Sequence, residues 1–137
     1  MTETIKSTLR SKREYEAELE YCISCLDTAA GEQRIALYEH ITFLRRQLSL
    51  IASWMKLLSE DEAFVTQRHM IDGIDIPRIV AEYEAKWGRE FAKSERTIKT
   101  YQQRAINRIA EFERRKMEIV PKKKRTQAVP TSQELQQ

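Results

Sequence analysis

The sequence of 137 residues has few turn-forming residues, little cysteine and no long apolar run. Glycine and proline occur three times each, so together they make up 6 of the 137 residues. In globular proteins they average about 12 per cent. So few turn residues argue against a β-sandwich, a β-barrel or an enzyme built on a Gly-rich phosphate loop. No apolar run reaches the roughly 18–20 residues that span a bilayer, and the first residues lack the apolar stretch of a signal peptide. We therefore expect a nearly all-helical, soluble, cytoplasmic protein with no membrane partner.

The two cysteines, Cys22 and Cys25, form a single CxxC pair. One pair is too little for a disulfide framework and supplies half of a structural zinc site. The pair lies in a helical pattern beside Ile23 and Leu26, which favours buried thiols; a site shared by two subunits is the alternative. The sequence also has no nucleophile elbow, no Gly-rich phosphate loop and no HExxH motif. We predict that the protein is not an enzyme and holds no metal or cofactor.

Basic residues are concentrated in the C-terminal third, although the net charge is only +3. Residues 1–92 contain 12 Lys or Arg and 16 Asp or Glu, a net charge of −4. Residues 93–125 contain 12 and 4, a net charge of +8. Such an asymmetry indicates a polyanionic partner, most often nucleic acid. A solvated helix face followed by a solubilising tail would give the same charges.

Apolar periodicity predicts two helices in the first 57 residues. An apolar stripe runs from residue 3 to about 28 and weakens at 11–13, which predicts that the first turns fray. A turn is expected at 28–31, where Gly31 can end the helix. The next helix carries an unbroken a/d seam, consisting of Leu37, Ile41, Leu44, Leu48, Ile51, Met55 and Leu58. Residues 1–57 therefore read as an αα-hairpin or short coiled coil whose stripes pack on each other or on a second chain. We interpret the seam as the oligomerisation surface of a homodimer.

Capping residues divide the next part of the chain into three helices. Ser59 and Glu62 fit a capping box that begins a helix ending near residue 71. Gly73 suits the turn that follows, and Asp75 caps a second helix. Ser94 caps a final long helix that is rich in basic residues. Helix, Gly turn, short helix and longer basic helix is the order found in helix-turn-helix proteins.

The C-terminal segment 119–137 is polar and contains one basic cluster. We predict that it is a disordered tail, because it has too little apolar surface to offset the entropy of ordering. The cluster is similar both to a nuclear-import signal and to the phosphate-contacting runs of nucleic-acid-binding tails. It consists of Lys122, Lys123, Lys124 and Arg125.

Three stretches of the chain resemble region 4 of sigma-70-type transcription factors. They are residues 58–73 (LSEDEAFVTQRHMIDG), 73–80 (GIDIPRIV) and 94–109 (SERTIKTYQQRAINRI). The resemblance covers about 58–112 and implies a helix-turn-helix domain over 58–118. With a helical arm in front, the chain is similar to small phage transcriptional regulators of the ArpU and RinA type. In one respect it departs from the family: Ser94 follows about eight residues later than a tight turn would place it, so 84–93 contains either two more helical turns or a loop.

The resemblance implies a sequence-specific, double-stranded DNA-binding transcriptional regulator, encoded by a phage or prophage and acting in the cytoplasm of a bacterial host. It also allows RNA polymerase as a further partner. In helix-turn-helix proteins the start of the recognition helix enters the major groove, and here that helix starts at Ser94. With the apolar positions facing inward, the expected base-reading residues are Glu95, Arg96, Lys99, Thr100 and Gln103. The expected phosphate contacts are Arg78, Lys93, Arg104, Arg108, Lys122, Lys123, Lys124 and Arg125.

Two other functions fit the same pattern. A DNA-packaging protein such as a small terminase subunit also combines a helix-turn-helix with oligomerising helices. A helical adaptor that binds other proteins would use the heptad seam of 37–58 as its working surface.

Overall fold

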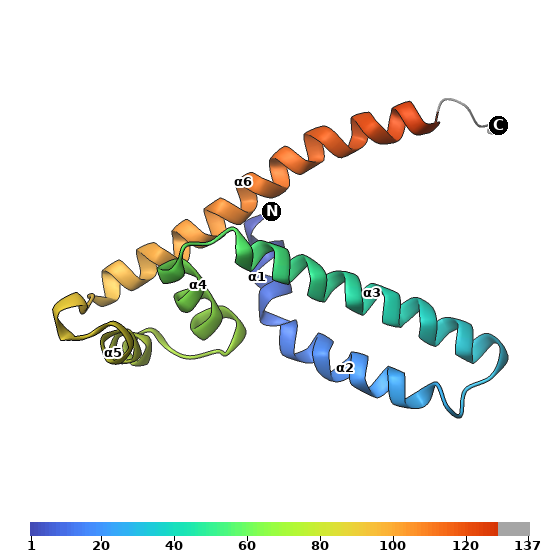
Figure 1. The fold of residues 1–137 in the computed structure, drawn as a ribbon, viewed down its shortest axis with the longest axis horizontal. Coiled ribbons are helices and arrows are strands. Elements are labelled where there is room, and N and C mark those ends of the chain that lie inside the picture. Colours follow the sequence, from blue (N-terminus) through green and yellow to red (C-terminus); the bar gives the residue numbers. More distant parts are fainter. Residues whose placement is uncertain (129–137) are drawn as a thin grey trace.

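The structure is a computed structural model that describes residues 1–128, with side chains up to residue 118. No strand occurs in this range, so the prediction of an all-α fold is confirmed (Figure 1). None of the helices described has both the length and the apolar character needed to cross a membrane. In chain order the elements are α1 (Thr2–Arg10), α2 (Lys12–Cys25), α3 (Gly31–Lys56), α4 (Glu60–Thr66), the π-helical turn η1 (Gln67–Ile71), α5 (Ile76–Trp87), the 3₁₀ turn η2 (Arg89–Phe91) and α6 (Glu95–Ala128).

Helices α2 and α3 form the predicted αα-hairpin, which extends from the rest of the molecule as an arm (Figure 1). Cys22, Ile41 and Leu44 are buried between the two helices. Leu19, Leu26, Leu37 and Tyr15 pack around them. The two apolar stripes therefore pack on each other.

The apolar seam of α3 packs against other helices of the same chain. Its first half packs on α2, where Ile41 and Leu44 are 3% and 0% exposed. In its second half Ile51 is fully buried in a different cluster, and Met55 and Leu58 pack against that cluster. The interpretation of the seam as an oligomerisation surface was therefore wrong for this fold. Heptad spacing shows that a helix buries one face, and here the chain itself supplies the partners.

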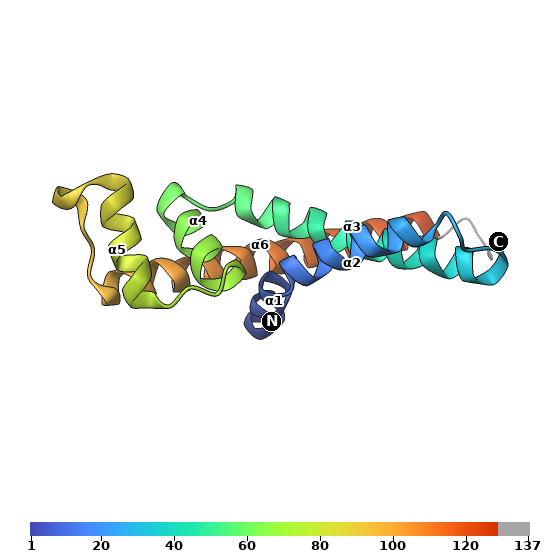
Figure 2. The same cartoon turned by 90° about the horizontal axis from the view of Figure 1, so that it is seen from below.

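Helix α1 is a separate, well-packed element, so the prediction of fraying first turns was wrong. The chain bends after Arg10, and α1 projects to one side of α6 (Figure 2). Ile5 and Leu9 are buried against Ile106 and Ile109 of α6. The same cluster includes buried side chains of α3 and of η1, namely Ile51, Trp54, Met70 and Ile71. The predicted segments 1–57 and 58–118 therefore share one core.

Helices α4, α5 and α6 surround a second apolar cluster formed by Val65, Ile79, Tyr83 and Ile98. All three predicted caps are present. Ser59 and Glu62 form the capping box, and the Asp75 carboxylate accepts from the Arg78 N–H. Ser94 Oγ accepts from the Thr97 N–H at 3.2 Å. Gly73 lies at φ +72°, a left-handed conformation that favours glycine, in the turn between η1 and α5.

Helix α6 continues without a break from Glu95 to Ala128. At 1.5 Å per residue its length is about 50 Å. This helix includes residues 119–128, which belong to the segment predicted to be a disordered tail. Lys, Arg and Gln have good intrinsic helix propensity, so a lack of apolar surface does not exclude a helix that extends from a packed one. The rest of the predicted tail, 129–137, lies outside the described residues.

Candidate nucleic-acid interface

The N-terminal half of α6 has one buried side and one exposed side. Ile98, Ala105, Ile106 and Ile109 are fully buried against the neighbouring helices. All the predicted base-reading residues are exposed, namely Glu95, Arg96, Lys99, Thr100 and Gln103. At 100° per residue, Arg96, Thr100 and Gln103 lie within one 60° sector of the helix surface. Lys99 lies about 60° and Glu95 about 100° to one side of Arg96, so the five exposed residues span an arc of about 140°, with Glu95 at its edge.

Two hydrogen bonds order the polar side chains of this face. Thr100 Oγ1 donates to the Arg96 carbonyl at 3.0 Å, and Gln103 Nε2 donates to Asn107 Oδ1 at 2.9 Å. Sequence reasoning missed Asn107, although it lies four residues after Gln103 and so on the same face of the helix. Its exposed amide can pair with adenine as well as a glutamine can.

The cations of this face are not neutralised within the part of the chain whose side chains are described. Arg96, Lys99 and Arg104 are exposed, and none of them lies within 4.0 Å of a described carboxylate oxygen. Their charges are therefore available to an external anion.

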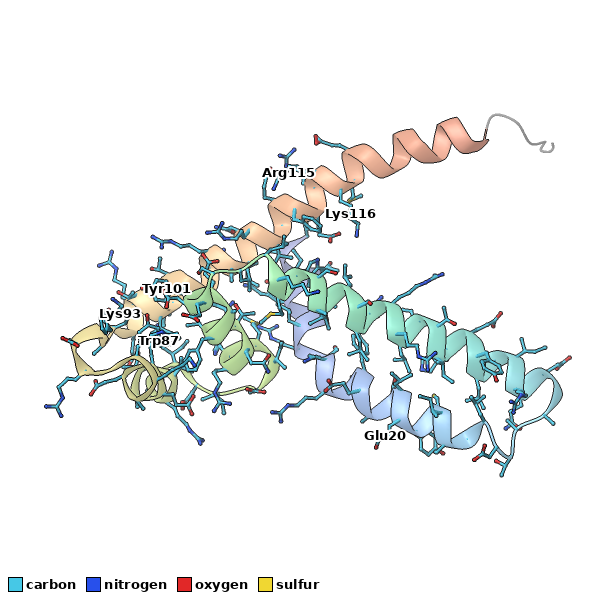
Figure 3. All side chains as sticks on the ribbon, viewed as in Figure 1. Glu20, Trp87, Lys93, Tyr101, Arg115 and Lys116 are labelled. Atoms are coloured by element: carbon cyan, nitrogen blue, oxygen red, sulfur yellow. The ribbon has the colours of Figure 1, made fainter. Side chains whose placement is uncertain are left out.

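The connection before α6 combines helix and loop. Helix α5 reaches Trp87, Gly88 reverses the chain at φ +103°, and η2 occupies Arg89–Phe91. Trp87 packs 4.2 Å from Tyr83 and 5.1 Å from Phe64, measured between ring centroids. Tyr101 joins the same aromatic cluster (Figure 3). Trp87 and Tyr101 are both partly buried in this cluster, which fixes the start of α6 against α5.

Three of the predicted phosphate-contacting residues have side chains that solvent, and so a DNA phosphate, can reach. Lys93 lies where the chain enters α6 (Figure 3) and is partly exposed. The Arg78 side chain is 67% exposed, and its Nε lies 3.5 Å from Glu82 Oε2. Arg104 is exposed on α6. The side chains of Lys122, Lys123, Lys124 and Arg125 lie outside those described.

Arg108 has a structural role, and its predicted phosphate contact stays a prediction because its side chain is 55% exposed. Its guanidinium donates to both carboxylate oxygens of Glu62, at 2.9 and 3.1 Å. The Glu62 side chain is only 5% exposed, and it also accepts from the Ser59 N–H. Burial raises the pKa of this carboxyl, but the hydrogen bonds from Arg108 and Ser59 outweigh burial and hold it below its ordinary value. The pair joins the start of α4 to α6, a partnership across 46 residues that helix periodicity does not reveal.

A second ion-pair network, absent from the sequence expectations, ties α5 to η1. The Arg68 guanidinium donates twice to Glu82 and once to Asp72, each at 2.8 Å. Asp72 also accepts from Arg13 of α2. The hydrogen bonds from Arg68 lower the pKa of Glu82. For Asp72, burial raises the pKa, but hydrogen bonds from Arg13, Gln67 and Arg68 lower it below its ordinary value. The network positions α5 relative to the rest of the domain.

The two cysteines are unbridged thiols. Cys22 is buried in the hairpin, as expected, and Cys25 is partly buried. Among the side chains described, no three His, Cys, Asp or Glu residues are grouped as metal ligands would be.

Comparison with family models, curated proteins and solved structures finds no match.

Proposed function

We propose that this protein is a sequence-specific double-stranded DNA-binding transcriptional regulator of the phage type, and that it reads the major groove with the start of α6. One observation carries the proposal. The exposed side of α6 gathers cationic, amide and hydroxyl side chains on one surface, while its other side is fixed in the core.

The chemistry of these side chains suits base edges. Arg96 and Lys99 can donate to the O6 and N7 atoms of guanine, and Gln103 can bond to adenine through two hydrogen bonds. Glu95 can accept from the amino group of cytosine. The major groove, about 12 Å wide, admits one α-helix, and α6 begins beside α5 at the end of the molecule opposite the arm (Figure 1). Lys93, Arg78 and Arg104 would then hold the phosphates on either side.

Double-stranded DNA is the proposed partner. RNA polymerase is a further proposed partner, which rests on the sigma-like resemblance alone. A homodimer through the seam of 37–58 is withdrawn, because that seam is buried within one chain. The adaptor hypothesis in its original form needs the same seam and loses its surface for the same reason.

The test is selection of bound fragments from a random duplex library, repeated at two salt concentrations. We expect a defined sequence motif that survives the higher salt. The double variant Arg96→Ala/Lys99→Ala should lose the motif. The matched control is Arg45→Ala/Arg46→Ala, which removes two exposed cations from α3 and should keep it. If wild-type protein enriches no motif and its binding disappears steeply with salt, the contacts are to phosphate only. That result would favour the packaging hypothesis.

A further inference from the structure

A cleft of about 310 Å³ lies between α1 and the exposed face of α6. Lys6 and Arg10 of α1 line one wall, and Lys99 and Gln103 of α6 line the other. Three cationic side chains from two helices far apart in sequence therefore face one space. No carboxylate occurs among the residues that line it.

The charges of this cleft are nearly uncompensated. Lys6 has one acidic neighbour, with Nζ 3.6 Å from Glu3 Oε2, and the Glu3 side chain is 81% exposed. Neither Arg10 nor Lys99 lies within 4.0 Å of a carboxylate oxygen among the side chains described. Cations held side by side repel one another, and a bound anion would relieve that repulsion.

A buried polar side chain also lines the cleft. Gln102 is only 8% exposed, and its Nε2 makes a long hydrogen bond of 3.4 Å to Thr66 Oγ1. Its Oε1 has no hydrogen-bond partner among the described residues. Because the Thr66 hydroxyl can donate as well as accept, the Gln102 amide can turn either end toward a ligand. Buried polar groups are seldom left unpaired, so this amide has hydrogen-bonding capacity left for a polar group in the cleft.

We infer that the cleft between α1 and α6 binds a phosphodiester group of duplex DNA, beside the groove that α6 enters. The inference rests on the proposed function and adds α1 to the DNA interface. Phosphate oxygens accept several hydrogen bonds at once, which matches a guanidinium, two ammonium groups and side-chain amides. Lys99 and Gln103 belong both to the cleft and to the base-reading face. A strand backbone that runs along that face would therefore pass the cleft.

The experiment is a DNA-binding titration of the full chain at several salt concentrations, using the duplex selected with wild-type protein. The variant Lys6→Gln/Arg10→Gln should bind every duplex about tenfold more weakly with the same base preference. Its slope of log affinity against log salt should be smaller by about 1 to 2, since each lost phosphate contact removes about 0.9. The control Arg45→Gln/Arg46→Gln removes the same charge from α3 and should bind as wild type does.

A second variant distinguishes a lost DNA contact from a loss of folded structure. Glu3→Gln removes the one carboxylate that faces Lys6, so affinity should rise, and unfolding cannot produce a rise. Inorganic phosphate added to the titration should compete weakly with every duplex, and to the same extent. If millimolar phosphate saturates the cleft but leaves DNA binding unchanged, the cleft is a site for a free anion and the inference is overturned. Unchanged affinity and salt slope in Lys6→Gln/Arg10→Gln would also overturn the inference. The proposed function would still stand in that case if Arg96→Ala/Lys99→Ala lost the sequence motif. Failure of wild-type protein to bind any duplex would overturn both.

Discussion

Replacement of Leu44 by alanine tests whether the seam of α3 holds the monomer together. Leu44 is 0% exposed and packs between α2 and α3 beside Cys22 and Ile41. Leu→Ala changes at fully buried sites cost about 2–5 kcal/mol of unfolding free energy. The arm is only two helices thick, so its helices can partly close the cavity, and we expect the lower part of this range, about 2–3 kcal/mol. For a chain of this length that corresponds to a fall in Tm of roughly 6–12 °C.

The assay is thermal and urea denaturation followed by circular dichroism at several protein concentrations. Ile35→Ala is the matched control, since Ile35 is 61% exposed on the same helix and its loss should change stability by no more than about 0.5 kcal/mol. If the seam instead joined two chains, the wild-type Tm would rise with protein concentration, and Leu44→Ala would shift the sedimentation of a dimer to that of a monomer. A concentration-dependent Tm, or a Leu44→Ala variant as stable as Ile35→Ala, would refute the assignment of the seam to the monomer core.

Three further predictions follow from the other parts of the molecule. Arg96→Ala should cost about 1–3 kcal/mol of binding free energy on the selected duplex and relax preference at one base pair; an equal loss on all sequences would make it a phosphate contact. Arg108→Ala should lower stability at pH 7, whereas Arg104→Ala should not, as measured by urea denaturation. Because the folded-state pKa of Glu62 is depressed, the contribution of the Arg108 pair is present above the unfolded-state value of about 4.3 and is lost as the pH falls through the folded-state value, so the two variants should converge in acid. Deletion of residues 121–137 should weaken binding to all duplexes alike and flatten the salt dependence; altered base preference in the deletion would contradict this division of roles.

Features encoded within a few neighbouring residues could be predicted from the sequence. The caps at Ser59, Asp75 and Ser94 depend on side chains that bond to backbone three residues away, and all three are present. The hairpin of α2 and α3 was also predictable, because two adjacent amphipathic helices joined by a short turn have their nearest apolar partner in each other. The exposed positions of α6 followed from its apolar periodicity in the same way.

Features that depend on distant partners could not be predicted. An exposed arginine and one paired to a buried carboxylate look the same in a helical pattern, so the pairing of Arg108 with Glu62 could not be predicted. The weak pattern at 11–13 indicated fraying, whereas α1 is held by Ile106 and Ile109, almost a hundred residues later. The cleft formed by Lys6, Arg10 and Lys99 escaped notice for the same reason.

The docking of α1 on α6 also sets an order for folding during synthesis. The cluster between α2 and α3, around Cys22, Ile41 and Leu44, is complete once residue 44 has left the ribosome, so this part of the hairpin can form early. Ile5 and Leu9 must wait for Ile106 and Ile109, which at 5–20 residues per second follow roughly 5–20 s later. During that interval the apolar face of α1 has only its partners in α3 and η1, namely Ile51, Trp54, Met70 and Ile71. We therefore expect the side of α1 that packs on α6 to stay exposed, and accessible to chaperones, until Ile106 and Ile109 have been translated.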